Sequence, residues 1–154
     1  MDAETRLQKL GLVLPPASAP QGLYHAVVIV DKMAYTSGHL PTGPDGQLMV
    51  GRVGETLDEQ AGAEAARRAG LALLASLRAA LGNLNRVRRV VKLLGVVNCT
   101  PDFTRQPAVI NGCSQLLADV FGPEIGIGAR SALAAPTLPL GVPVEIEAVF
   151  ELNV

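Results

Sequence analysis

The sequence predicts an α+β fold in which two helices pack on one face of a mixed sheet, in the order ββ-α-β-α-ββ. Short runs of β-branched and aliphatic residues alternate with two longer segments whose apolar residues recur every three or four positions. Hydrophobic residues make up 49% of the chain and aromatic residues only 3%, so the core must be aliphatic. A chain of 154 residues can bury a sizeable core. We therefore expect a single domain over residues 1–154, with residues 1–20 as an N-terminal lead-in.

The first half of the chain is expected to hold a hairpin, a long loop and a helix. Residues 24–30 and 33–37 are apolar runs separated by Asp31-Lys32, which indicates a hairpin. Residues 38–54 contain five glycines and two prolines, which is typical of a long loop, and such loops are often functional. Thr56 and Glu59 have the spacing of a capping box, so the helix is expected to begin at Thr56.

The second half is expected to hold a central strand, a second helix and two final strands. Residues 87–98 are apolar on both faces, which predicts a central strand covered on both sides. Pro107 is expected in the first turn of the next helix, which ends at Gly122-Pro123. Residues 127–134 and 144–152 then read as strands.

Charge and cysteine content exclude several classes of protein. The net charge is −1, so no overall field attracts nucleic acid or an anionic membrane. A basic cluster at the beginning of the central strand has no interleaved aromatic residues to stack on bases and is expected to be solvated; it comprises Arg86, Arg88, Arg89 and Lys92. No apolar stretch approaches the ~20 residues of a membrane span. Cys99 and Cys113 are expected to be reduced core thiols, and the expected compartment is the cytoplasm.

Searches for common catalytic motifs find no phosphate-binding glycine loop, no GxGxxG, no GxSxG and no HExxH. The two histidines, His25 and His39, are too few for most zinc sites. Each is more typical of a surface or partly buried residue than of a metal ligand.

Arg130 is the first candidate binding residue, in the segment Gly128-Ala129-Arg130-Ser131. Strand alternation places it on one face with Ala132 and Ala134. These small neighbours leave space for a ligand, and a planar guanidinium can hold a carboxylate through two hydrogen bonds. The same pattern is typical of an exposed arginine on an edge strand, and pattern alone favours that second interpretation.

Glutamates alternate with apolar residues along the last expected strand. Glu145, Glu147 and Glu151 share one face, opposite the apolar face. This spacing fits a solvated sheet face, and it also fits a carboxylate that faces Arg130 as a proton donor or acceptor. Spacing leaves both interpretations open.

Four segments, taken together and in this order, resemble the successive signatures of the RidA (YjgF-type) family, over nearly the whole chain from about residue 12. They are Tyr35-Thr36-Ser37-Gly38-His39-Leu40-Pro41, Cys99-Thr100-Pro101-Asp102-Phe103, Gly128-Ala129-Arg130-Ser131-Ala132 and Val144-Glu145-Ile146-Glu147-Ala148. The resemblance implies a chorismate-mutase-like fold and a homotrimer with ligand clefts between subunits. It also implies hydrolysis of reactive enamines and imines to 2-oxo acids and ammonia, without a metal or organic cofactor.

The resemblance assigns roles residue by residue. Arg130 matches the family arginine that binds the substrate carboxylate, and Glu147 matches the carboxylate credited with handling the attacking water. Tyr24 lies where a family tyrosine closes the cleft from a neighbouring subunit. Ser37 and Asn111 match polar positions that line or support the site.

The sequence also departs from the family pattern. Ala132 stands where many members have cysteine and is expected to line the substrate site, His39 replaces a common glutamine, and the loop of residues 42–54 and the lead-in are longer. These features predict a longer side-branch member. The expected partner is a small imino or oxo acid, acted on by a 2-iminobutanoate/2-iminopropanoate deaminase-like hydrolase. The alternative is a non-catalytic protein that binds small carboxylates or serves a regulatory role. Nucleic acid and membrane are not expected partners.

Overall fold

In the computed structural model, which describes residues 1–153, five strands form one mixed sheet in the order β1-β2-β5-β3-β4. The β1-β2, β2-β5 and β5-β3 pairs are antiparallel, and β3 and β4 are parallel. The strands are β1 (Val27–Val30), β2 (Met33–Thr36), β3 (Val87–Asn98), β4 (Ala129–Ala135) and β5 (Val144–Leu152). The helices are α1 (Ala3–Lys9), α2 (Glu59–Leu81), α3 (Gln106–Phe121) and α4 (Pro123–Gly126), with short 3-10 turns at Leu84–Arg86 and Pro139–Gly141.

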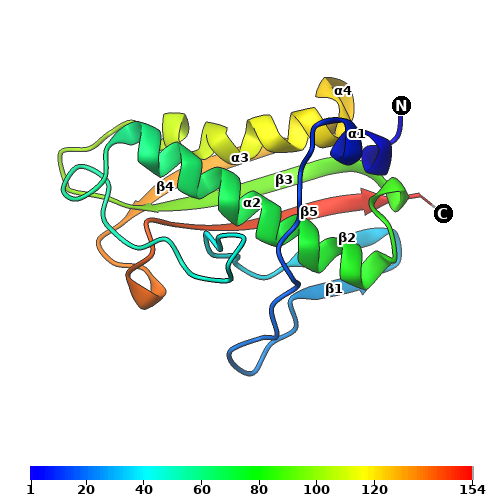
Figure 1. The fold of residues 1–154 in the computed structure, drawn as a ribbon, viewed down its shortest axis with the longest axis horizontal. Helices are drawn as coiled ribbons and strands as arrows, with labels where there is room; N and C mark the ends of the chain where they lie inside the picture. The colour runs from blue at the N-terminus through cyan, green and yellow to red at the C-terminus, as the bar shows by residue number, and fades with distance from the viewer. Residues whose placement is uncertain (154) are drawn as a thin grey trace.

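The two long helices, α2 and α3, lie side by side over one face of the sheet (Figure 1). This confirms the α+β class and the predicted placement of the helices. Their contact is close because Gly112 has no side chain: a Cβ there would lie 1.9 Å from the Ala63 carbonyl oxygen. The core beneath them is aliphatic apart from two phenylalanines, and its largest fully buried side chains include Phe150, Leu73, Leu74, Leu77, Ile110 and Leu117.

The predicted beginning of the first long helix is wrong. The helix starts at Glu59, and the N-cap is Asp58, whose carboxylate accepts a hydrogen bond from the Ala61 amide at 2.8 Å. Thr56 does not form a capping box because its hydroxyl oxygen accepts from the Arg52 amide at 2.9 Å, within the preceding turn. Pro107 lies in the first turn of α3, as predicted.

Strand boundaries agree with the prediction for β3 and β5 and differ elsewhere. The first strand begins at Val27 instead of residue 24, because β2 offers pairing partners only for Val27–Val30. The fourth strand begins at Ala129 instead of residue 127. The residues before it form α4 and a short link that the sequence analysis did not predict as separate elements.

The prediction that β3 is covered on both sides does not hold within one copy of the chain. Leu93 and Val97 are buried beneath the helices, whereas Leu94 and Val96 are half-buried on the opposite face. We call this opposite face the outer sheet face. Cys99 and Cys113 are free and buried, as predicted. In the described residues, no helix combines the length and apolarity needed to cross a membrane.

Candidate functional site

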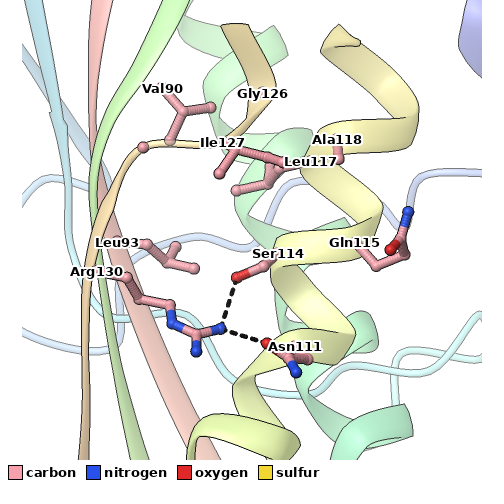
Figure 2. Close-up of a pocket in the computed structure, with 11 residues that line it drawn as sticks. Val90, Leu93, Asn111, Ser114, Gln115, Leu117, Ala118, Gly126, Ile127 and Arg130 are labelled. Atoms are coloured by element: carbon pink, nitrogen blue, oxygen red, sulfur yellow. Dashed lines mark hydrogen bonds between the residues drawn. The ribbon is translucent and has the colours of Figure 1, made fainter. Parts of the chain in front are cut away.

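Arg130 projects from β4 toward α3, where two side chains hold it (Figure 2). Its Nη1 donates to Asn111 Oδ1 at 2.7 Å and to Ser114 Oγ at 3.1 Å. Asn111 and Ser114 lie three residues apart on α3, so they share one face of that helix. The interpretation as a free arginine on an edge strand is therefore wrong in one respect. The strand is at the edge of the sheet, but the guanidinium is turned back onto the helix.

Both of these hydrogen bonds leave from Nη1, so the opposite edge of the guanidinium, formed by Nε and Nη2, makes no bond to any described residue. An arginine edge with two parallel N–H groups matches the two oxygens of a carboxylate. The positive charge of Arg130 also affects the buried thiol of Cys113. Burial raises the pKa of Cys113 to about 12, and the nearby Arg130 guanidinium opposes that rise.

A cavity of about 450 Å³ opens beside Arg130, between α3 and the link from α4 to β4. Asn111, Ser114 and Arg130 line one end of it, and the other end is apolar (Figure 2). The cavity lies within the lower part of the size range of small-molecule sites, roughly 300–1,000 Å³. Ala132 is half-buried two residues farther along β4, on the Arg130 side of the strand.

Tyr24 and Ser37 line a second cavity, of about 270 Å³, near β1 and β2. The Ser37 hydroxyl donates to the His25 carbonyl oxygen at 2.6 Å, and the Tyr24 hydroxyl oxygen accepts from the Gln21 amide at 3.2 Å. Tyr24 remains 47% exposed, so its ring is accessible to a neighbouring molecule.

His39 follows Ser37 by two residues and is buried, whereas a surface or partly buried position was expected. Its Nδ1 lies 2.7 Å from the Ser37 carbonyl oxygen, which can only accept, so Nδ1 carries a proton. Its Nε2 lies 2.8 Å from Ser76 Oγ on α2. Burial lowers the pKa of His39, and the bond to Ser37 partly opposes this effect. The neutral ring therefore ties the end of β2 to α2.

Glu147 is exposed on the outer sheet face, and Glu145 lies on the same face two residues earlier. Burial, and then the neighbouring Glu147 carboxylate, raise the pKa of Glu145. The Glu145 carboxyl group packs against Gly38: a Cβ added there would lie 2.7 Å from Glu145 Cδ. A carboxyl group whose pKa is raised holds a proton more readily than a solvated one, which suits it to proton transfer.

Strand register shows which of these groups share a face. Leu93 of β3 pairs with Arg130 on one side and with Ala148 on the other, and both Leu93 and Ala148 are buried beneath the helices. The next residue, Leu94, pairs with Ser131 and with Glu147. Residues directly opposite one another point to the same face. Arg130 and Glu147 therefore lie on opposite faces of the sheet.

Within one copy, then, the predicted site residues form two separate groups. Arg130, Asn111 and Ala132 lie at the β4 edge, and we call them, with Ser114, the arginine half-site. Tyr24 and Ser37 line the second cavity near β2, and Glu145 contacts Gly38, the residue after Ser37; we call Tyr24, Ser37, Glu145 and Glu147 the glutamate half-site. The hypothesis that Arg130 and Glu147 face one another is not met within a single chain.

Two residues beside the predicted site residues, Ser114 and Glu145, were not predicted as site residues from the sequence. Ser114 could have been found, because it follows Asn111 by one helical turn. Glu145 was noted only as one of several glutamates. Its contact with Gly38 joins residues more than a hundred positions apart, and no local pattern reveals it.

Comparison with known proteins places this geometry in a family. The sequence matches the family described as "YjgF/chorismate mutase-like, putative endoribonuclease" over residues 4–151. It is 44% identical over 147 residues to Protein TCP17 of Trypanosoma cruzi, covering 96% of this chain and 92% of that protein.

Solved structures agree with this match. A "putative endoribonuclease" from Shewanella oneidensis has a TM-score of 0.94 at 33% identity, covering 99% of this chain and 100% of the other. A protein of unknown function from Agrobacterium tumefaciens scores 0.88 at 38% identity, with 98% and 94% covered. RidA from a Psychrobacter species scores 0.62 at 26% identity, with 88% and 94% covered. The lower TM-score for RidA is consistent with the expectation that this chain is a side-branch member of the family. The chain belongs to the YjgF/chorismate-mutase-like family.

Proposed function

We propose that this protein hydrolyses reactive 2-enamino and 2-imino acids to 2-oxo acids and ammonia. The observation that carries the proposal is the half-free guanidinium of Arg130, oriented by Asn111 and Ser114 beside a cavity of about 450 Å³. A 2-imino acid has a carboxylate directly bonded to its imine carbon. An arginine that grips the carboxylate therefore fixes the reacting carbon as well.

Besides holding the carboxylate, the protein needs only to assist the transfer of protons during hydrolysis. Water adds to the electrophilic carbon of the C=N bond, and one of its protons moves to the nitrogen, which gives a carbinolamine. The hydroxyl proton of the carbinolamine then moves to the nitrogen as the C–N bond breaks, which releases ammonia and leaves a 2-oxo acid. One carboxyl group that accepts a proton from water and returns it to nitrogen is sufficient. We propose Glu147 for this role together with Glu145, whose raised pKa favours its holding a proton.

Because Arg130 and Glu147 lie on opposite faces of the sheet, we propose that a working site combines two copies of the chain. A homotrimer with clefts between subunits, as in the resembling family, would bring the β4 edge of one copy to the Glu145–Ser37 region of the next. The character of the outer sheet face supports this assembly. Its exposed or half-buried side chains include Val28, Tyr35, Val149, Leu94, Val96 and Leu133.

The test measures 2-oxo acid release from an imine that an amino-acid oxidase generates in the assay. The wild-type protein should accelerate release. Arg130→Ala should lower kcat/KM by about thirtyfold or more, the effect of removing one partner of a buried charge pair at ~2 kcal/mol. Arg130→Lys should remain impaired, because an ammonium cannot form the two parallel bonds.

Arg67→Ala is the matched control, since Arg67 is a partly exposed helix residue in a surface ion pair with Glu64. It should behave as wild type. The proposal fails if the wild-type protein gives no acceleration, or if Arg130→Ala performs as well as its parent.

A second candidate is a protein that binds small carboxylates without turnover. The separation of Arg130 from both glutamates within one chain favours it, since the arginine half-site alone can bind an acid. Calorimetry that shows 2-oxo acid binding lost in Arg130→Ala, with no hydrolysis by the wild type, would establish this alternative.

A further inference from the structure

The cavity beside Arg130 has two ends of different character. Arg130, Asn111 and Ser114 form the polar end, and Arg130 is the one charged residue among the described residues that line the cavity. Leu93 of β3 lies beside Arg130, and the other end is formed by aliphatic side chains from β3, α3 and the link to β4 (Figure 2); these are Val90, Leu117, Ala118 and Ile127. The apolar end has no side-chain charge to bind a second polar group.

Close backbone packing forms this apolar end. A Cβ at Gly126 would lie 2.4 Å from the Leu117 carbonyl oxygen, and one at Gly128 would lie 2.7 Å from that of Val90. The link from α4 to β4 therefore lies directly against α3 and β3. Between these two glycines, Ile127 lines the cavity and is still 57% exposed. An aliphatic side chain this exposed at a cavity wall is available to cover an apolar ligand group.

We infer that this protein selects 2-imino acids with a longer aliphatic tail over those with a methyl group. This inference rests on the proposed function. With the carboxylate held by Arg130, the remainder of the acid extends either out of the protein or along the cavity. The apolar wall favours the cavity because each methylene removed from water contributes about fourfold in affinity, ~0.8 kcal/mol.

The first measurement is calorimetric binding of a series of 2-oxo acids, from pyruvate through 2-oxobutanoate and 2-oxopentanoate to 2-oxohexanoate. We expect affinity to rise about fourfold with each methylene. The second measurement is kcat/KM for the corresponding imines generated in the assay, which should rise in the same order.

Ile127→Ala should reduce the dependence on tail length in both measurements and change pyruvate binding little. The matched control is Ile125→Ala, which shortens a partly exposed isoleucine two residues earlier, on α4 and outside the cavity. It should keep the wild-type dependence on tail length.

The outcomes separate this inference from the proposed function. Binding that strengthens with tail length, without any hydrolysis, would support the tail cavity and contradict the deaminase. Hydrolysis with a flat or falling dependence on tail length would support the deaminase and overturn the inference, as would equal slopes in Ile127→Ala and Ile125→Ala. Absence of binding by every acid in the series would overturn both.

Discussion

The position of the Arg130 guanidinium is fixed before any ligand arrives. Asn111 and Ser114 accept from the same nitrogen and so orient the plane of the group. Arginine otherwise loses up to ~2 kcal/mol of side-chain entropy when it is immobilised. Part of this entropy is already lost in the folded protein, so less is lost when a ligand binds to the Nε–Nη2 edge of the guanidinium, and binding there is stronger. At this scale, the carboxylate specificity that we propose rests on three side chains, Arg130 of β4 and Asn111 and Ser114 of α3.

His39 allows a prediction about pH. Its pKa in the folded protein lies below the ordinary value of 6.5, so the unfolded chain takes up a proton at a higher pH than the folded chain does. The stabilising contribution of His39 is therefore fully present above about pH 6.5. It is lost, and the free energy of unfolding falls, as the pH drops from about 6.5 through the folded-state pKa. His39→Gln removes this contribution, while the amide can still bond to Ser37 and Ser76.

The measurement is urea unfolding of wild type and His39→Gln at about pH 7.5 and about pH 5, at one protein concentration. Wild type should lose more stability than the variant between the two conditions. Other titrating groups are the same in both proteins and cancel in the comparison. An equal loss in the two proteins would show that His39 does not titrate differently on folding.

Individual site residues differed in how far sequence could predict them. Arg130 was found because four ordered motifs outweighed an ambiguous alternation pattern. Its partner Ser114 followed from helical spacing but was not named. The contacts of Glu145 with Gly38 and of His39 with Ser76 join distant parts of the chain, and they depend on how the sheet packs on α2. No local pattern carries that information.

Among the elements, the sheet bears most directly on how copies of the chain would assemble, because its outer face is partly apolar. The helices cover one face, and aliphatic and aromatic side chains occupy several rows of the other. One such row runs from Val28 through Tyr35 to Val149. Apolar patches of this kind are typical of interfaces.

Tyr35→Asp therefore should convert the proposed trimer to smaller species. Tyr35 is 45% exposed in one copy, so a charge there costs the isolated subunit little, but it would be desolvated in an interface. Sedimentation velocity of the wild type and the variant measures this, with circular dichroism to confirm folding.

Val13→Asp is the control, because Val13 is an 80% exposed aliphatic residue in the N-terminal lead-in. It should sediment as wild type. A wild-type protein that sediments as a monomer, or a Tyr35→Asp variant of unchanged size, would contradict the proposed use of the outer sheet face.

The elements themselves were largely predictable, and their ends were not. Apolar periodicity identified both long helices and all five strands, because each pattern reflects burial of one face or both. The start of α2 was misplaced since Thr56 and Asp58 are both capable N-caps, and only the turn at Arg52 decides between them. Strand ends depend on where the partner strand stops.

On the scale of the whole molecule, we propose that one copy holds two incomplete half-sites. Arg130 and its partners lie at the β4 edge, whereas Glu145 and Glu147 lie on β5 and Ser37 follows the end of β2. The order β1-β2-β5-β3-β4 places two strands, β5 and β3, between β2 and β4. A site that needs both groups must then be built between copies.

Complementation between two inactive variants tests this claim most directly. Arg130→Ala and Glu145→Gln, each impaired alone, are unfolded together, refolded as a mixture and assayed for imine hydrolysis; the mixture of Arg130→Ala with Glu147→Gln is treated in the same way. If arginine and glutamate come from different copies of a trimer, each mixed trimer regains one intact site. Activity should then recover to about a quarter of the wild-type value. A mixture no more active than the two variants assayed separately would contradict the account, because it would place both groups in one copy.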